Sequence, residues 1–423
     1  MNPPLLAELP YHADTADLFE AVADEPWALF FDSAQRRGDG RYDIVCARPY
    51  ATVTAWAHGI ELVTQDGMQR VQGDALEVLK ALLGESAASG DLPFAGGAAG
   101  YFSYDLGRHL EGLPAAGGDM PHMAVGLYDW ALVVDHEARR SWLAGQGRDA
   151  ATHAQWQDLV TLFSVPFMKG RRPRYGGLHA PVVEPDGADY ARAFARIRRY
   201  IVEGDCYQVN LARRFTVAAS GDPWEGYRRL RRDNPAPFGA YLHLPGMQVL
   251  SASPERFLQV RDGQVETRPI KGTRPRAADA REDGRLAEAL RTSPKDRAEN
   301  LMIVDLLRND LGKACAIGSV AVPALFEVES FATVHHLVST VTGRLAPGRG
   351  ALDLLRACLP GGSITGVPKR RAMEIIEELE PGRRGVYCGA IGYVGFDGAM
   401  DTSIAIRTLV QRGDEARFWA GGG

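Results

Sequence analysis

The stretch from Ser253 to Thr273, SPERFLQVRDGQVETRPIKGT, constrains the chain most, because two short apolar runs flank an Asp-Gly pair. Asp-Gly supplies the positive backbone φ that a two-residue hairpin turn needs. We therefore predict a β-hairpin that turns at Asp262 and Gly263. Glu255 precedes its first strand and Lys271 follows its second, so both should lie at the same end of the hairpin. A carboxyl group beside an amine is a candidate pair of general acid and nucleophile.

Lys271 has two interpretations from its neighbours alone. Arg268 and Arg274 flank it at equal distance in sequence. Nearby cations and burial both lower the pKa of a lysine, and an unprotonated lysine in a stiff loop is a nucleophile. The alternative is a solvated lysine in a basic loop. Composition alone favours that alternative, because side chains with a strongly shifted pKa are a minority in proteins.

Composition and charge exclude several classes of protein. The chain has 423 residues, 45% of them hydrophobic, and a net charge of −5, which gives no reason to expect nucleic acid or an anionic membrane as a partner. Its five cysteines are scattered without a C-x-x-C pair, so neither a disulfide framework nor a zinc site is indicated. The N-terminus lacks the features of a signal peptide, and no apolar run approaches membrane-spanning length. We expect a cytoplasmic protein.

Short apolar runs broken by Gly, Asp and Pro predict antiparallel strands over 27–66, 125–134 and 140–143. Helical spacing of apolar residues predicts helices over 75–83, from near Asp189 as N-cap to Gly204, and over 285–289, 295–311 and 369–380. The segment 164–185 is rich in Pro, Gly and Arg and shows no periodicity, so it is a candidate linker. The predicted organisation is a β-rich N-terminal region at 1–165, a linker at 166–188 and a catalytic region at 189–423.

Two further stretches carry candidate chemistry. Glu299 shares a helix face with Met302 and Leu306, where a carboxylate is costly unless it has a partner. It is either an acid favoured at a helix start or a metal ligand, and the pattern favours neither. The turn PGGSITG at 360–366 opens a helix with Pro368 in its first turn. Free backbone N–H groups and the helix dipole make such a turn a natural carboxylate site.

Eight motifs occur in the order and spacing of the chorismate-utilising enzymes, and the chain resembles that family on them. They are YQVNLARRF (207–215), SPERF (253–257), RPIKGT (268–273), DRAENLMIVDLLRNDLG (296–312), HHLVST (335–340), PGGSITGVPK (360–369), GAIGY (389–393) and SIAIRT (403–408). Eight ordered motifs are far more specific than a single short one. The resemblance covers residues 190–423 strongly and reaches the N-terminal region through GYFSYDLGR (100–108). It implies an α+β fold of two large antiparallel β-sheets packed as a sandwich, with helices outside and the site in a cleft.

Two positions select a branch of the family. Members that activate water carry a lysine where this chain has Gln208, and a glutamine cannot act as that base. Members that form anthranilate carry alanine where this chain has Lys271, whereas members that form 4-amino-4-deoxychorismate carry lysine. The resemblance therefore implies conversion of chorismate and ammonia to 4-amino-4-deoxychorismate, on the way to p-aminobenzoate and folate. Anthranilate formation is the alternative reaction, and a non-catalytic tryptophan sensor is the alternative of another class.

The resemblance also implies roles for single residues. Lys271 would attack ring C2, Glu255 would protonate the leaving C4 hydroxyl, and Glu299 matches one of the glutamates that hold Mg²⁺. His336 matches a histidine near C2, and a packed core histidine is an equally open interpretation. Tyr393 and Arg407 match the residues that hold the enolpyruvyl carboxylate. The remaining substrate-binding matches are Gln208, Gly272, Thr273, Ser363, Thr365, Gly421 and Gly422.

The family also implies partners and a second pocket. A tryptophan pocket would use Ser33 from the run 29–33 and Pro237 and Phe238 from the run 234–238. Family members continue past the final glycines with a helix that carries further glutamate ligands, so we expect an incomplete ligand set in a chain that ends at Gly423. None of the five cysteines lies in a G-x-C-x-G elbow, so the expected source of ammonia is a separate glutamine amidotransferase subunit.

Overall fold

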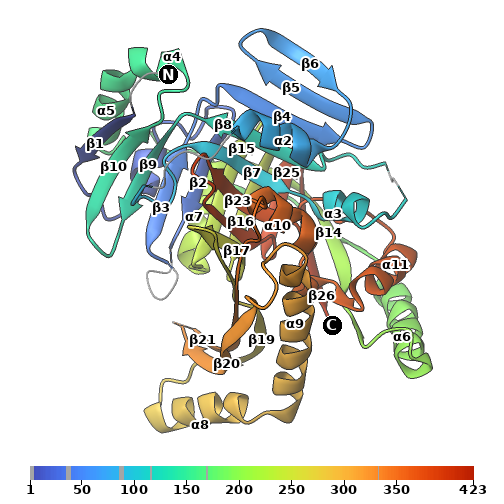
Figure 1. Ribbon diagram of the computed structural model, residues 1–423. Coiled ribbons are helices and arrows are strands. Elements are labelled where there is room, and N and C mark those ends of the chain that lie inside the picture. The colour runs from blue at the N-terminus through green and yellow to red at the C-terminus, as the bar shows by residue number, and fades with distance from the viewer. Residues whose placement is uncertain (1–3, 35–39, 85–89, 115–116, 168–169, 332) are drawn as a thin grey trace.

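The computed structural model of the protein describes residues 4–34, 40–84, 90–114, 117–167, 170–331 and 333–423. Within these residues the chain forms two 12-stranded sheets and one small strand pair, and helices lie outside the sheets (Figure 1). Neighbouring strands are antiparallel throughout, as in the pairs of β15 (Phe238–Leu244) with β16 (Met247–Ser253) and of β23 (Ala390–Gly395) with β24 (Met400–Ile404). The predicted α+β class with two large antiparallel sheets is confirmed.

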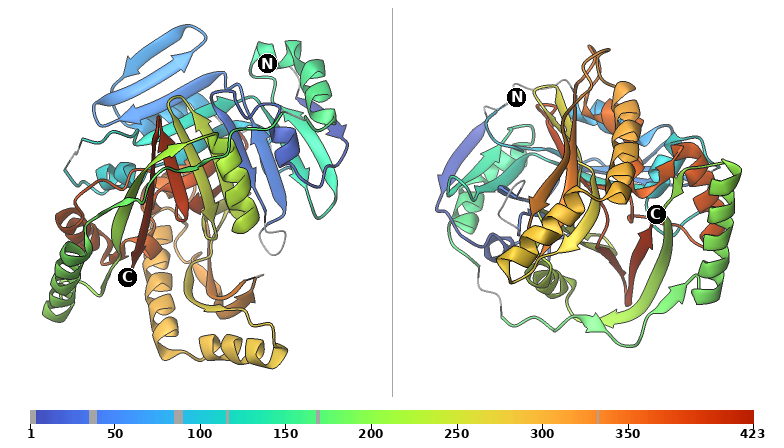
Figure 2. Two further views of the ribbon diagram at one scale, coloured as in Figure 1. Left: turned by 180° about the vertical axis from the view of Figure 1, so that it is seen from behind. Right: turned by 90° about the horizontal axis from the view of Figure 1, so that it is seen from below.

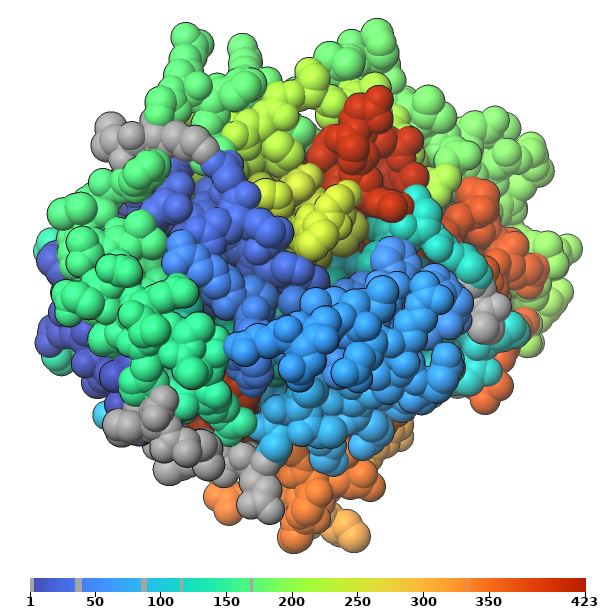
Figure 3. Space-filling model, turned by 90° about the horizontal axis from the view of Figure 1, so that it is seen from above, coloured from blue at the N-terminus to red at the C-terminus, as the bar shows by residue number. Residues whose placement is uncertain are grey.

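The first sheet joins the N-terminal strands to the end of the chain. Its strands, in spatial order, are β1 (Leu5–Leu9), β10 (Arg140–Gly145), β9 (Trp130–Asp135), β3 (Tyr42–Cys46), β2 (Ala28–Asp32), β15, β16, β25 (Thr408–Arg412), β26 (Glu415–Gly422), β14 (Leu211–Ser220) and β11 (Gly176–Gly177). The strand β12 (Val182–Glu184) also pairs with β14. In the space-filling view from above, blue, yellow and red segments of the chain share one face (Figure 3).

The second sheet carries the predicted hairpin. Its spatial order is β19 (Ile270–Pro275), β21 (Val334–Arg344), β18 (Gln264–Thr267), β17 (Arg256–Arg261), β24, β23, β7 (Gly97–Phe102), β8 (Met123–Tyr128), β4 (Ala51–Trp56), β5 (Gly59–Thr64) and β6 (Gly67–Val71). The strand β20 (Ala321–Ser330) also pairs with β21, and β13 (Gln208–Val209) forms a separate pair with β22 (Gly366–Val367). Strands β19, β20 and β21 extend away from the sandwich beside α8 (Ala280–Arg291) and α9 (Pro294–Gly312) (Figure 2).

The main core lies between the two sheets. One cluster of buried apolar side chains includes Leu29 and Val249 of the first sheet together with Val125 and Leu258 of the second. A second cluster packs the outer face of the first sheet against helices. The remaining helices are α1 (Ala16–Phe19), α2 (Ala75–Leu83), α3 (Tyr104–Leu110), α4 (Ala150–Ala154), α5 (Trp156–Ser164), α6 (Gly187–Glu203), α7 (Pro223–Asp233), α10 (Ala351–Cys358) and α11 (Lys369–Leu379), with a 3₁₀ turn at Gly362–Ile364. No helix of the described ranges is long and apolar enough to cross a membrane.

The hairpin prediction is confirmed, and several helix ends differ from the prediction. Strands β17 and β18 pair Arg261 with Gln264, and Asp262 and Gly263 between them have φ of 49° and 71°. The N-cap of helix α6 is Asp186 instead of Asp189, because the Asp186 side chain accepts a hydrogen bond from the Asp189 N–H, and the helix begins at Gly187.

Two more boundaries need correction. Helix α11 begins at Lys369 as predicted, but Pro368 is its N-cap instead of a first-turn residue. Helix α8 runs from Ala280 to Arg291, well beyond the predicted 285–289, because Asp279 caps it far ahead of Leu286, its first large apolar residue. Residues 168–169 of the predicted linker lie outside the described ranges. Both sheets contain strands from 1–165 and from 189–423, and the boundary between the two regions stays a prediction.

Candidate active site

The hairpin brings Glu255 and Lys271 together with the glycine-rich turn at 360–366. Glu255 directly precedes β17, and Lys271 is the second residue of β19. The Lys271 Nζ donates a hydrogen bond to the Ser363 carbonyl oxygen at 2.9 Å. The Ser363 hydroxyl and the Ile270 backbone hydrogen-bond to the Glu255 carboxyl group, which also interacts with the charge of Lys271. Three separately predicted site residues therefore meet in one place.

The environment of Glu255 suits a general acid. Its surface is only 6% exposed, and this burial raises the pKa of Glu255, although Lys271, Ser363 and Ile270 act in the opposite direction. A carboxyl group with a raised pKa keeps its proton at a higher pH than an exposed glutamate does. Glu255 can therefore deliver a proton to a leaving group.

The two arginines that flank Lys271 both have carboxylate partners. Arg268 pairs with Glu329, and the Arg274 guanidinium lies 2.7 Å from the Asp296 carboxylate. The sequence places two cations beside the amine, and the fold brings carboxylates from β20 and α9 to balance them. The distinctive contact of Lys271 is instead its hydrogen bond to the backbone of the turn.

His336 lies on β21 directly opposite Thr273 of β19. Its Nδ1 is 2.9 Å from the Thr273 hydroxyl oxygen. Burial and the charge of Arg407 lower the pKa of His336 to about 4, although a backbone contact of Gly272 opposes this shift. His336 is therefore neutral at neutral pH, and it lies in the same neighbourhood as Arg407 and β19.

Arg407 presents a cation without a carboxylate partner among the described residues. It has a positive φ of 50°, and no ion pair joins its guanidinium to another residue of the described ranges. Partial burial lowers the pKa of Arg407, but a guanidinium stays charged at neutral pH. A planar guanidinium of this kind beside a neutral histidine suits a carboxylate of an incoming ligand.

The other predicted substrate-binding positions differ in what they can contact. Thr365 is fully buried, and its hydroxyl donates to the Gly361 carbonyl oxygen at 3.0 Å, so it holds the turn together. Gln208 is also buried, and its side chain lies so close to Gly423 that a Cβ there would collide with it. Gly421 and Gly422 belong to β26 and pair with Ala212 and Leu211.

Glu299 is one carboxylate on the half-buried face of α9. The Lys295 Nζ lies 3.7 Å from its carboxylate, so this ion pair does not hold its oxygens tightly. Among the described residues no group of three or more His, Cys, Asp or Glu side chains is arranged to hold a metal ion. Mg²⁺ commonly uses one or two carboxylates and fills its other positions with substrate and water, so Glu299 fits as a single protein ligand of this kind.

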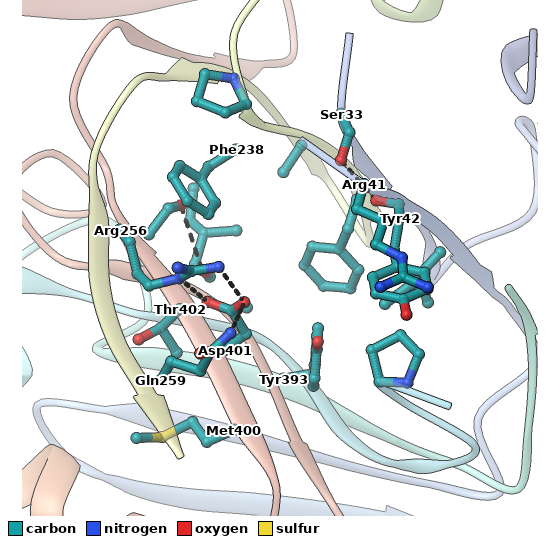
Figure 4. A pocket seen from close by; sticks show the side chains of 18 of the residues that line it. Ser33, Arg41, Tyr42, Phe238, Arg256, Gln259, Tyr393, Met400, Asp401 and Thr402 are labelled. Atoms are coloured by element: carbon teal, nitrogen blue, oxygen red, sulfur yellow. Dashed lines mark hydrogen bonds and ion pairs between the residues drawn. The ribbon is translucent and has the colours of Figure 1, made fainter. Parts of the chain in front are cut away.

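A separate cavity of about 530 Å³ contains Tyr393 together with Ser33, Pro237 and Phe238 (Figure 4). Tyr393 packs against Phe31 with ring centroids 5.9 Å apart. The family resemblance grouped Tyr393 with Arg407, whereas the structure places it among the residues of the predicted tryptophan pocket.

This cavity lies next to Glu255 in sequence. Arg256, the residue after Glu255, lines the cavity and forms ion pairs at 3.2 Å with both Asp401 and Glu266. Glu255 of the candidate active site and Arg256 of the cavity lining are therefore neighbours at the start of β17.

Comparison with known proteins agrees with this arrangement. Residues 28–423 match the model of the chorismate binding enzyme family. The chain belongs to this family. The predicted recognition is confirmed over nearly the whole sequence, and the match includes the strands from β2 onward.

Three members illustrate the relationship. The chain is 46% identical to aminodeoxychorismate synthase component 1 of Klebsiella aerogenes, over 100% of this chain and 94% of that protein. It is 44% identical to the Escherichia coli K12 protein of the same name, over 99% of this chain and 93% of that protein. The crystal structure of anthranilate synthase component I from Streptococcus pneumoniae matches with a TM-score of 0.79 and 32% identity, covering 90% of this chain and 87% of that one.

Two residues of this chorismate binding enzyme contact the site although the sequence analysis did not single them out. Asn210 lies inside YQVNLARRF, and its side chain donates to the Ile364 carbonyl oxygen at 3.1 Å. Arg384 lies between two motifs, is fully buried, and contacts that same carbonyl oxygen. A buried arginine has no periodic signal in a sequence, because its partners come from distant segments.

Proposed function

We propose that the chain converts chorismate and ammonia to 4-amino-4-deoxychorismate through a covalent adduct at Lys271. The observation that carries this proposal is the Lys271 amine, held by the Ser363 carbonyl beside the buried Glu255 carboxyl group. The names of the two full-length relatives support the same reaction, and the alanine expected of an anthranilate-forming site is absent at position 271.

The residues of this chain then have distinct roles. Arg407 binds a carboxylate of chorismate through its guanidinium. The unprotonated Lys271 Nζ forms a bond to ring C2 while the C4–O bond breaks, and Glu255 gives its proton to the departing hydroxyl, which leaves as water. Ammonia then forms the C4–N bond, the C2–Nζ bond breaks, and the proton released by the nitrogen nucleophiles restores Glu255.

Mg²⁺ held by Glu299 would neutralise charge on the ring carboxylate of the substrate. We expect Glu299→Gln to raise the Mg²⁺ concentration for half-maximal activity by at least about tenfold, since ligand changes cost roughly that much in metal affinity. An Mg²⁺ titration of turnover measures this, and a thermal melt checks the fold.

Asp305→Asn is the matched control, because Asp305 is another α9 carboxylate and its partner is Arg308. It should leave the Mg²⁺ titration unchanged. An unaltered titration in Glu299→Gln, with a melt like that of the unmodified protein, would make Glu299 a helix-start acid only.

We further propose that the aromatic cavity binds tryptophan. Phe31, Phe238 and Tyr393 supply an apolar wall, and Ser33 with the Arg256 ion pairs supplies polar groups, as an amphipathic amino acid requires. Calorimetry should detect tryptophan binding, and Phe238→Ala should weaken it by at least about tenfold, as expected for loss of a buried aromatic contact. Equal heats of dilution with and without protein would contradict the proposal.

The reaction itself is tested with the purified chain, chorismate, Mg²⁺ and an ammonium salt at mildly alkaline pH. The expected product has the mass of 4-amino-4-deoxychorismate and yields p-aminobenzoate only after addition of a lyase. Accumulation of fluorescent anthranilate without a lyase would instead assign the chain to the anthranilate-forming reaction.

A further inference from the structure

Arg384 is a fully buried cation that follows α11. Its side chain is 1% exposed, and the carboxylate of Glu380, itself 6% exposed, balances its charge. The Arg384 Nε and Nη2 donate to the two Glu380 oxygens at 2.9 and 2.6 Å. The rings of Tyr104 and Tyr387 lie near its guanidinium, with centroids at 4.8 and 5.8 Å. Burying such a pair is costly, so its remaining hydrogen bonds need an explanation.

The remaining donors of this pair reach two segments of the candidate active site. Arg384 Nη1 donates to the Ile364 carbonyl oxygen at 3.1 Å, and Nη2 donates to the Asn210 carbonyl oxygen at 2.7 Å. Glu380 accepts the Ala212 N–H at 2.8 Å. The pair thus connects the end of α11 to the segment around Asn210 and to the turn that carries Ser363.

The turn that carries Ser363 is held from outside as well as by its own Thr365 hydroxyl. Its glycines Gly361, Gly362 and Gly366 leave the backbone permissive. The partner of the Lys271 amine is the backbone carbonyl of Ser363, so the direction of that amine depends on the path of the main chain. The next carbonyl, that of Ile364, is the one that Arg384 and Asn210 both hold.

We propose that Arg384 is a positioning residue that, with Glu380 and Asn210, fixes the 361–366 turn and thereby aims the Lys271 amine and the Ser363 hydroxyl that contacts Glu255. This inference rests on the proposed roles of Lys271 and Glu255. A purely structural Arg384 would affect the stability of the fold but not the chemistry of Lys271 in the protein that remains folded.

Two variants separate these roles. Arg384→Lys keeps the charge but cannot reach Glu380, Ile364 and Asn210 together. Asn210→Ala removes one of the two side-chain donors to the Ile364 carbonyl and leaves the buried ion pair intact. This second variant therefore tests the positioning of the turn even if Arg384→Lys does not fold. Arg172→Lys is the control, because Arg172 is similarly buried and paired with Glu20 and Asp222, outside the candidate active site.

Two measurements are made on each variant. The first is kcat with chorismate and ammonia, together with its pH profile. The second is the rate at which acetic anhydride acetylates Lys271 relative to the exposed Lys295, read by peptide mass spectrometry, which needs no turnover.

In Arg384→Lys and Asn210→Ala we expect kcat to fall at least about tenfold, as for a misplaced reacting group, with the KM for chorismate much less changed. The alkaline limb of the pH profile should move upward, because the Ser363 hydroxyl no longer stabilises the ionised Glu255. Lys271 acetylation should rise severalfold, whereas Arg172→Lys should change only the melting temperature. Unchanged Lys271 acetylation in both folded variants overturns the inference, and absence of turnover in the unmodified protein overturns the proposed function instead.

Discussion

Lys271→Ala is expected to lower formation of 4-amino-4-deoxychorismate by on the order of 10³-fold or more, as removal of an activated nucleophile does. The amine lies within hydrogen-bonding distance of the Ser363 carbonyl and interacts with the buried Glu255, so its loss removes the nucleophile from beside the acid. Product formation from chorismate and ammonia, followed by mass spectrometry, measures the loss. A small gain of anthranilate is also expected, since alanine is the residue of the anthranilate-forming branch.

The matched control is Lys295→Ala. Lys295 is a second lysine near the site, but its side chain is 82% exposed and its ion pair with Glu299 is 3.7 Å long. Its loss should change turnover little, because a long exposed pair contributes little. Unchanged 4-amino-4-deoxychorismate turnover in Lys271→Ala would refute the covalent role and would leave Lys271 as a structural partner of the 360–366 turn.

The sequence predicted the part of the site that local structure controls. The Asp-Gly turn fixes the β17–β18 hairpin, and a hairpin brings the residue before its first strand close to the residues after its second. Glu255 and Lys271 therefore come together for a reason that the stretch from Ser253 to Thr273 contains. The same holds for the opposition of Thr273 and His336, which follows once β19 pairs with β21.

Other parts of the site depend on pairings between distant segments. Tyr393 belongs to β23, which lies between β24 and β7, and its ring packs against Phe31 of the first sheet. Arg384 meets Asn210 across 174 positions of the chain. Such contacts have no periodic signature, because tertiary packing rather than propensity decides them.

The charges around Lys271 also depend on distant segments that the local sequence does not reveal. A run of arginines near one lysine makes its surroundings strongly positive only if the arginines stay unpaired. Glu329 comes from β20 and Asp296 from α9, and both pair with the flanking arginines once the fold is complete. The chemistry of Lys271 is therefore set by its hydrogen bond to the turn and by Glu255, which the linear sequence does not display.

The second prediction with a large expected effect on turnover concerns the source of ammonia. We expect the purified chain to use ammonium salts and to show no turnover with glutamine. A glutaminase needs a reactive thiolate, and all five cysteines of this chain are buried. Burial raises the pKa of every one of these thiols, which are Cys46, Cys206, Cys315, Cys358 and Cys388. We therefore propose that a separate glutamine amidotransferase supplies ammonia in the working complex.

The pH dependence of the turnover rate, measured with an ammonium salt and with glutamine, tests this proposal. Free ammonia is the nucleophile and is mostly protonated at neutral pH, so the rate with an ammonium salt should rise as pH increases until Glu255 loses its proton. Addition of a glutamine amidotransferase subunit should allow turnover with glutamine at neutral pH. A cysteine-blocking reagent applied to the chain alone should leave the ammonia-dependent rate unchanged, since these thiols are buried. Turnover with glutamine by the single chain, with contaminating glutaminase excluded, would mean that the chain carries its own amide-hydrolysing nucleophile. That result would overturn the proposal of a separate glutamine amidotransferase.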